Sequence, residues 1–116
     1  MASVLVVDDN RATCDMLADV LRDWGHIVRT AYSGSRALTL SAESLPDVIM
    51  VEITMPTMDG YEVARRLREA LDAPRIVGMS AEPGTEFEEF EYLFDDFCRK
   101  PLGGDCISRA LGDHAN

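Results

Sequence analysis

Residues 48–60 read VIMVEITMPTMDG, and this stretch gives the clearest indication of the fold. Its first four residues are apolar, which is typical of a parallel strand buried on both faces. Glu52 ends that run, and the Met-Pro and Asp-Gly pairs after it indicate a tight loop. A second apolar run, residues 4–7, ends in the same way in Asp8 and Asp9. The two stretches therefore predict two central strands that end in acids.

Outward from these runs, five strand patterns alternate with five helical patterns, which indicates an α/β fold with a parallel sheet. The strands are expected at residues 3–7, 26–31, 47–51, 75–79 and 96–99, and the helices at 11–24, 35–43, 61–71, 85–94 and 105–111. The first, third and fourth strands are almost wholly apolar, whereas the other two carry charged residues, as edge strands do. We predict a doubly wound, five-stranded, flavodoxin-like sheet of order 2-1-3-4-5 with helices on both faces.

Apolar residues at helical spacing indicate the helix faces that pack on the sheet. We expect Gly25 to end the first helix and Asp105 to cap the last one. The inward residues are expected to be Met16, Leu17, Val20, Leu21 and Trp24 in the first helix, Val63, Ala64, Leu67 and Leu71 in the third, and Phe87, Phe90, Leu93 and Phe94 in the fourth.

The length of 116 residues predicts one domain spanning residues 1–116, and 47% apolar residues suit a folded core. No apolar run reaches the ~20 residues that span a membrane, and the chain enters a strand at once, so we expect neither a membrane segment nor a signal peptide. His26 and His114 are expected at the surface. The cysteines are odd in number and lack metal-type spacing, which predicts reduced thiols in a cytoplasmic protein; they are Cys14, Cys98 and Cys106.

The net charge of −10 argues against binding nucleic acid, because phosphates repel such a surface. The acids are concentrated in residues 82–96, which contain no Lys or Arg. A charged helix face of this kind is either simply solvated or the docking site of a basic partner.

Polar residues end four of the predicted strands, and the carboxyl ends of parallel strands meet at one edge of the sheet. We therefore expect Asp8, Asp9, Glu52, Ser80 and Lys100 to lie together. Carboxylates gathered in one place repel one another, so either one of them takes up a proton or a cation is bound. Oxygen ligands without His or Cys favour Mg²⁺ as that cation. The lysine and the hydroxyl would complete a cradle for a phosphoryl group.

With these motifs the whole chain resembles a response-regulator receiver domain of the CheY-like family. The resemblance implies a flavodoxin-like fold and Mg²⁺ as cofactor. Asp9 looks like a direct ligand of that ion, Asp8 like one that acts through water, and the backbone carbonyl of Thr54 like a further ligand. Glu52 stands where the family has the aspartate that accepts the phosphoryl group, and it would also face the metal.

Three further positions take their expected roles from the same resemblance. Lys100 looks like the lysine that contacts the acyl phosphate, and the bond from Lys100 to Pro101 resembles a dipeptide that is usually cis in the family. Ser80 looks like the switch hydroxyl. Phe97 looks like the switch aromatic, whose rotation reports the state of that hydroxyl.

The chain departs from the family pattern in two places. Glu52 replaces the acceptor aspartate, and residues 80–97 form a segment about two residues tighter that lacks the usual Ala-Gly turn. The longer side chain moves the carboxylate by about 1.5 Å, and phosphoryl transfer is sensitive to displacements of that size. We therefore expect impaired phosphorylation and a weak imitation of the phosphorylated state. Glu52 is either native or a substitution that locks the switch, and the sequence alone leaves both open.

The resemblance implies a two-component receiver module that is not an enzyme. Its partners would be a histidine kinase or phosphotransfer protein for input and a downstream protein at the face formed by helix four, strand five and helix five, where a homodimer is also possible. The alternative is a phosphate-independent pseudo-receiver that only docks. A magnesium-dependent phosphohydrolase is disfavoured, because its Asp-x-Asp nucleophile pattern is absent.

Overall fold

The computed structural model describes residues 1–70, 72–82, 84 and 86–114. Its strands form one five-stranded parallel sheet in the order β2-β1-β3-β4-β5, as predicted. The strands are β1 Ser3–Val7, β2 Ile27–Ala31, β3 Val48–Glu52, β4 Arg75–Ser80 and β5 Asp96–Arg99. The helices are α1 Arg11–Asp23, α2 Gly34–Glu43, α3 Gly60–Arg68, α4 Glu86–Phe90, the 3-10 turn η1 Glu91–Leu93, α5 Gly104–Leu111 and the 3-10 turn η2 Gly112–His114.

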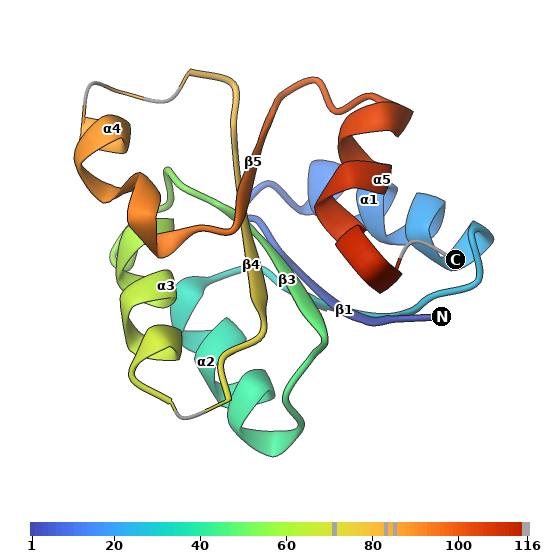
Figure 1. Cartoon of the computed structure of the whole chain (residues 1–116), viewed down its shortest axis with the longest axis horizontal. Helices are drawn as coiled ribbons and strands as arrows, with labels where there is room; N and C mark the ends of the chain where they lie inside the picture. The colour runs from blue at the N-terminus through green and yellow to red at the C-terminus, as the bar shows by residue number, and fades with distance from the viewer. Residues whose placement is uncertain (71, 83, 85, 115–116) are drawn as a thin grey trace.

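The sheet lies between two layers of helices, with α1 and α5 on one face and α2, α3 and α4 on the other (Figure 1). Each face buries its own apolar cluster, because successive residues of a strand point to opposite faces. The first cluster includes Val4, Val6, Leu17, Leu21, Met50, Met79, Ile107 and Leu111. The second includes Leu5, Val7, Ile49, Val51, Val63, Leu67, Ile76 and Phe94. No helix in the described ranges is long and apolar enough to cross a membrane.

Helix α1 begins where Asn10 caps it, with the side chain of Asn10 accepting a hydrogen bond from the amide of Thr13. Gly25 follows its end at φ 94°, a left-handed conformation that glycine adopts without a steric penalty, so the predicted stop is confirmed. The predicted inward face is partly wrong. Met16 is 68% exposed and Trp24 is 43% exposed. Both side chains lie outside the part of the first helix that the sheet covers. The apolar pattern alone therefore predicted a wider buried face than this helix has.

The loop after β3 depends on close backbone approach at Gly60. A Cβ added there would lie 2.6 Å from the carbonyl oxygen of Glu52, so only glycine fits. Asp59 caps α3 by accepting a hydrogen bond from the amide of Glu62, and the amide of Gly60 donates to the carbonyl of Ile53. The predicted tight loop is thus confirmed, and it brings the start of α3 directly against the end of β3.

The fourth and fifth helices differ from the prediction in their ends. The expected helix at 85–94 is a five-residue helix followed by a 3-10 turn. Leu93 and Phe94 are buried, whereas Phe87 and Phe90 are only half-buried. In α5 the N-cap is Gly103 without a side-chain hydrogen bond, so the prediction that Asp105 caps this helix is wrong. Asp105 instead lies in the first turn, where an acid favours the helix dipole. Leu71, expected inside α3, lies outside the described residues.

His26 is buried at the start of β2, so its predicted surface position is wrong. Its Nδ1 accepts a hydrogen bond from the amide of Ala2, and its buried Nε2 has no protein partner in the described part of the chain. Burial is the main cause that lowers the pKa of His26, followed by the positive charge of the N-terminus and, least, by that of His114. The folded state therefore favours the neutral ring.

This arrangement predicts a pH-dependent stability. The unfolded chain takes up a proton on histidine near pH 6.5, before the folded chain does, so the free energy of unfolding should fall as pH drops from about 7 to 5. A single group can contribute a slope of at most about 1.4 kcal/mol per pH unit. Chemical unfolding across this range should lose that slope in His26→Gln and keep it in the control His114→Gln. An unchanged slope in His26→Gln would contradict the assignment.

Candidate functional site

The ammonium of Lys100 lies between two buried carboxylates at the carboxyl edge of the sheet. Its Nζ is 2.5 Å from Oδ2 of Asp8 and 2.6 Å from Oε1 of Glu52. The side chain of Lys100 is 18% exposed, that of Asp8 2% and that of Glu52 9%. Residues from the ends of β1 and β3 and from the loop after β5 thus meet in one buried cluster, which we call the acidic pocket.

Backbone amides hold both carboxylates of the acidic pocket in place. Asn10 donates its amide hydrogen to Oδ1 of Asp8 at 3.0 Å, and Thr54 donates its amide hydrogen to Oε2 of Glu52 at 3.0 Å. Each carboxylate therefore uses one oxygen for a loop amide and the other for Lys100. Such bonds stabilise the charged form of a carboxylate.

Lys100 is itself held by its backbone, since its amide donates to the carbonyl of Ser80 at the end of β4. Burial pulls the pKa of the Lys100 ammonium down, but the hydrogen bonds and charges of Asp8 and Glu52 outweigh burial and leave that pKa raised. The lysine is therefore charged at neutral pH. One ammonium against two carboxylates leaves the acidic pocket with a net negative charge.

The remaining predicted site residues lie around this pocket in different ways. Asp9 is exposed, and no hydrogen bond or ion pair joins its side chain to the pocket in the described residues. Thr54 is exposed and contributes its amide to Glu52. Ser80 is buried and meets Lys100 through the backbone. The bond between Lys100 and Pro101 is cis, as the family resemblance implied.

Phe97 lies outside the acidic pocket and packs against the α4 side of the sheet. Its ring is half-buried, with its centroid 4.5 Å from that of Phe87. A Cβ on Gly78 would lie within 3.3 Å of the rings of Phe94 and Phe97, so glycine at that position of β4 makes room for both. The helix α4 is thereby packed directly on the residue predicted to be the switch aromatic.

The donor atoms of this edge suit a hard divalent cation. Within the described ranges, no three His, Cys, Asp or Glu side chains are placed together to hold a metal ion. Asp8 and Glu52 nevertheless offer buried carboxylate oxygens, and Asp9, which follows Asp8 in sequence, offers a third carboxylate. The pocket also keeps a net negative charge after the charge of Lys100 is counted. Oxygen-only donors with this charge fit Mg²⁺ in type.

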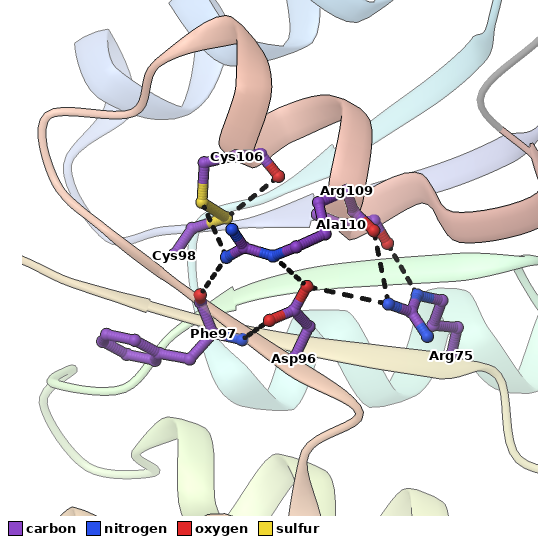
Figure 2. The surroundings of a disulfide bond; sticks show 7 residues. All are labelled: Arg75, Asp96, Phe97, Cys98, Cys106, Arg109 and Ala110. Atoms are coloured by element: carbon purple, nitrogen blue, oxygen red, sulfur yellow. Dashed lines mark hydrogen bonds and ion pairs between the residues drawn. A yellow bond between two sulfur atoms is a disulfide. The ribbon is translucent and has the colours of Figure 1, made fainter.

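A covalent bond beside the pocket was missed by the sequence reasoning. Cys98 and Cys106 form a disulfide with Cα atoms 5.9 Å apart (Figure 2), so the prediction of reduced thiols is wrong for this pair. Cys14 remains a buried thiol, and burial above all raises its pKa to about 11. The pairing arises because α5 docks on β5 and places the two cysteines opposite one another.

Ion pairs next to this disulfide fasten α5 to the sheet (Figure 2). Arg109 donates from Nε to Asp96 at 2.8 Å and from a terminal nitrogen to the carbonyl of Phe97 at 3.0 Å. Arg75 of β4 donates to the carbonyl of Ala110 at 2.7 Å. Desolvation opposes ionisation of Asp96, but the hydrogen bond and charge of Arg109 prevail and lower its pKa.

Comparison with known proteins now assigns the family. The model of the response regulator receiver domain matches residues 4–111, and the chain therefore belongs to that family of two-component signalling modules. The solved structure of a putative response regulator from Chloroflexus aurantiacus is 28% identical, with a TM-score of 0.85 and complete coverage of both chains. The chemotaxis protein CheY4 of Vibrio cholerae is also 28% identical, with a TM-score of 0.85 and 96% coverage of each chain.

A curated relative places a similar sequence inside a larger protein. The chain is 31% identical over 114 residues to the sensor histidine kinase RcsC of Salmonella typhi. That alignment covers 97% of this chain and 12% of the relative, so the chain spans about an eighth of that protein's length.

Proposed function

We propose that this chain is a receiver domain in which Glu52 occupies the phosphoacceptor position and replaces phosphorylation with a permanent carboxylate contact. The observation that carries the proposal is the 2.6 Å ion pair between Glu52 and Lys100. In the family, the matching lysine contacts the phosphoryl group. Here the longer side chain already reaches that lysine, and its other oxygen is taken by the amide of Thr54.

The extra methylene explains why this carboxylate is a poor acceptor. It moves the oxygens outward by about 1.5 Å, whereas in-line transfer tolerates displacements of about 1 Å only with losses of ~100-fold. Both oxygens are also engaged, which lowers their nucleophilicity. As an imitation of a phosphoryl group Glu52 is partial, because it brings one charge and two oxygens in place of nearly two charges and three oxygens.

The direct test is incubation with a small phosphodonor and Mg²⁺, followed by intact mass measurement. The proposal expects no covalent phosphoryl group on the unchanged chain. A mass gain of one phosphoryl group would instead support an ordinary phosphorylation switch and overturn the assigned role of Glu52.

Magnesium is the cofactor that the donor set fits, with Asp9 and Asp8 as its carboxylate ligands and the Thr54 carbonyl as a further one. When bound, the ion would neutralise negative charge at the pocket. Because Lys100 competes for Asp8, we expect weak binding that Asp9→Asn reduces at least tenfold. Mg²⁺ titration followed by NMR of the loop amides measures this, with the surface variant Asp19→Asn as control. Equal titration curves for Asp9→Asn and the unchanged chain would contradict the site.

The proposed input partner is a histidine kinase or a phosphotransfer protein, as expected for a cytoplasmic two-component receiver. The proposed output face consists of α4, η1, β5 and α5, where exposed acids lie on α4 and η1. These acids are Glu86, Glu88, Glu89 and Glu91. A basic patch on a downstream protein would complement them and make association faster and salt-sensitive.

A phosphate-independent docking module is the second candidate, and the ion pairs that Lys100 already makes in the pocket favour it. Lys100 is already paired with both carboxylates, so no phosphoryl group is needed to fix its position. Both candidates expect the unchanged chain to bind its downstream partner equally well with and without a phosphodonor. The variant Glu52→Asp separates them: under the first candidate its partner binding depends on the phosphodonor, and under this one it does not.

A further inference from the structure

The disulfide between Cys98 and Cys106 encloses the segment that carries Lys100. Cys98 lies in β5, Cys106 lies in the first turn of α5, and the two are 8 residues apart in sequence. Lys100 is two residues beyond Cys98. The disulfide therefore joins the two ends of the loop that brings the ammonium to Asp8 and Glu52, one end in the sheet and the other in a helix.

The two sulfurs differ in their surroundings. Cys98 is fully buried, whereas Cys106 is half-buried. A terminal nitrogen of Arg109 lies 3.5 Å from Sγ of Cys106. A guanidinium and the first turn of a helix both stabilise a thiolate. Cys106 is thus the reactive member of the pair, whereas Cys14 is a free, buried thiol of α1 that takes no part in the bond.

We propose that Cys98 and Cys106 form a reversible dithiol–disulfide couple that sets how firmly the Lys100 segment is held against the acidic pocket. A thiolate of an external dithiol attacks Sγ of Cys106, and Cys98 leaves as a thiolate that takes up a proton. The second thiol of the reagent then releases Cys106 and closes the reagent's own disulfide. Two electrons and two protons pass to the protein. In the reverse direction Cys106 attacks an external disulfide, and Cys98 resolves the mixed disulfide.

The change is expected to stay local, because other bonds keep α5 in place. Arg109 holds Asp96 and the carbonyl of Phe97, and Arg75 holds the carbonyl of Ala110. None of these bonds uses a cysteine sulfur. Reduction therefore frees the loop between β5 and α5 without undocking the helix. The hydrogen bond from the amide of Lys100 to the carbonyl of Ser80 then gives that amide less protection against hydrogen exchange.

The test compares oxidised and dithiothreitol-reduced protein. Alkylation in denaturant, followed by mass measurement, should find one free thiol in the oxidised form and three in the reduced form. Hydrogen exchange over residues 99–105 should be at least threefold faster after reduction. Cys106→Ser should exchange at the fast rate under both conditions, whereas the control Cys14→Ala should respond as the unchanged chain does.

Two results would overturn the proposal. The first is three free thiols after incubation with oxidised glutathione, which would show that the pair does not form. The second is equal exchange over residues 99–105 in the two redox forms, which would show that the bond does not restrain the lysine segment. Neither readout uses Mg²⁺ or a phosphodonor, so the couple can fail or succeed independently of the role proposed for Glu52.

Discussion

Glu52→Asp is expected to take up one phosphoryl group from a small phosphodonor in the presence of Mg²⁺, at a rate at least ~100-fold above that of the unchanged chain. Removing one methylene draws the carboxylate back from Lys100 and opens space for a phosphoryl group between them. The lysine then neutralises the charge that develops on the transferred group. Intact mass measurement over time gives the rate directly.

A matched control tests whether labelling depends on where the new aspartate lies or follows from any Glu→Asp change. Glu43→Asp makes the same deletion at an exposed residue at the end of α2 and should stay unlabelled. Loss of the label on treatment with hydroxylamine would identify an acyl phosphate rather than a phosphoserine at Ser80. If Glu52→Asp is folded and still unlabelled, the site lacks more than the position of one carboxylate.

Lys100→Met is expected to lower the free energy of unfolding at neutral pH by about 3–5 kcal/mol. The variant keeps most of the side-chain volume but leaves Asp8 and Glu52 buried without their shared cation. Two close carboxylates then repel each other in a poorly hydrated place, and one of them must take up a proton. Urea unfolding measures the loss, which saturating Mg²⁺ should partly restore.

The control for this loss is an ion pair at the surface. Arg66→Met breaks the exposed pair between Arg66 and Glu62 and should change stability by less than about 1 kcal/mol. The double variant Lys100→Met with Glu52→Gln should recover much of the loss, because only one buried carboxylate remains. Similar losses in Lys100→Met and Arg66→Met would show that the pocket does not depend on its lysine.

The sheet order and the meeting of Asp8, Glu52 and Lys100 were predictable because both follow from topology. Apolar runs identify the central strands, and parallel strands carry their carboxyl ends to one edge. The tight loop at Gly60 and the helix end at Gly25 were also predictable, because the glycine that each requires is visible in the sequence. Asp9 was harder, since the topology brings its backbone to the pocket but does not decide which way its side chain turns.

The features that escaped prediction depend on how elements pack against one another. Met16 has the spacing of a core residue, but the sheet covers only part of α1. His26 is buried and accepts a hydrogen bond from the amide of Ala2, which lies 24 residues earlier in the sequence. Cys98 and Cys106 were counted with Cys14 as an odd set, whereas the docking of α5 on β5 pairs two of them and leaves the third.

The most direct test of the central claim is a crystal structure of the chain with Mg²⁺ bound. The account predicts the Nζ atom of Lys100 within hydrogen-bond distance of the Glu52 carboxylate, and Mg²⁺ at Asp9 on the same edge of the sheet. A Glu52 side chain turned toward solvent, with Lys100 far from it, would contradict the claim that this glutamate stands in for a phosphoryl group.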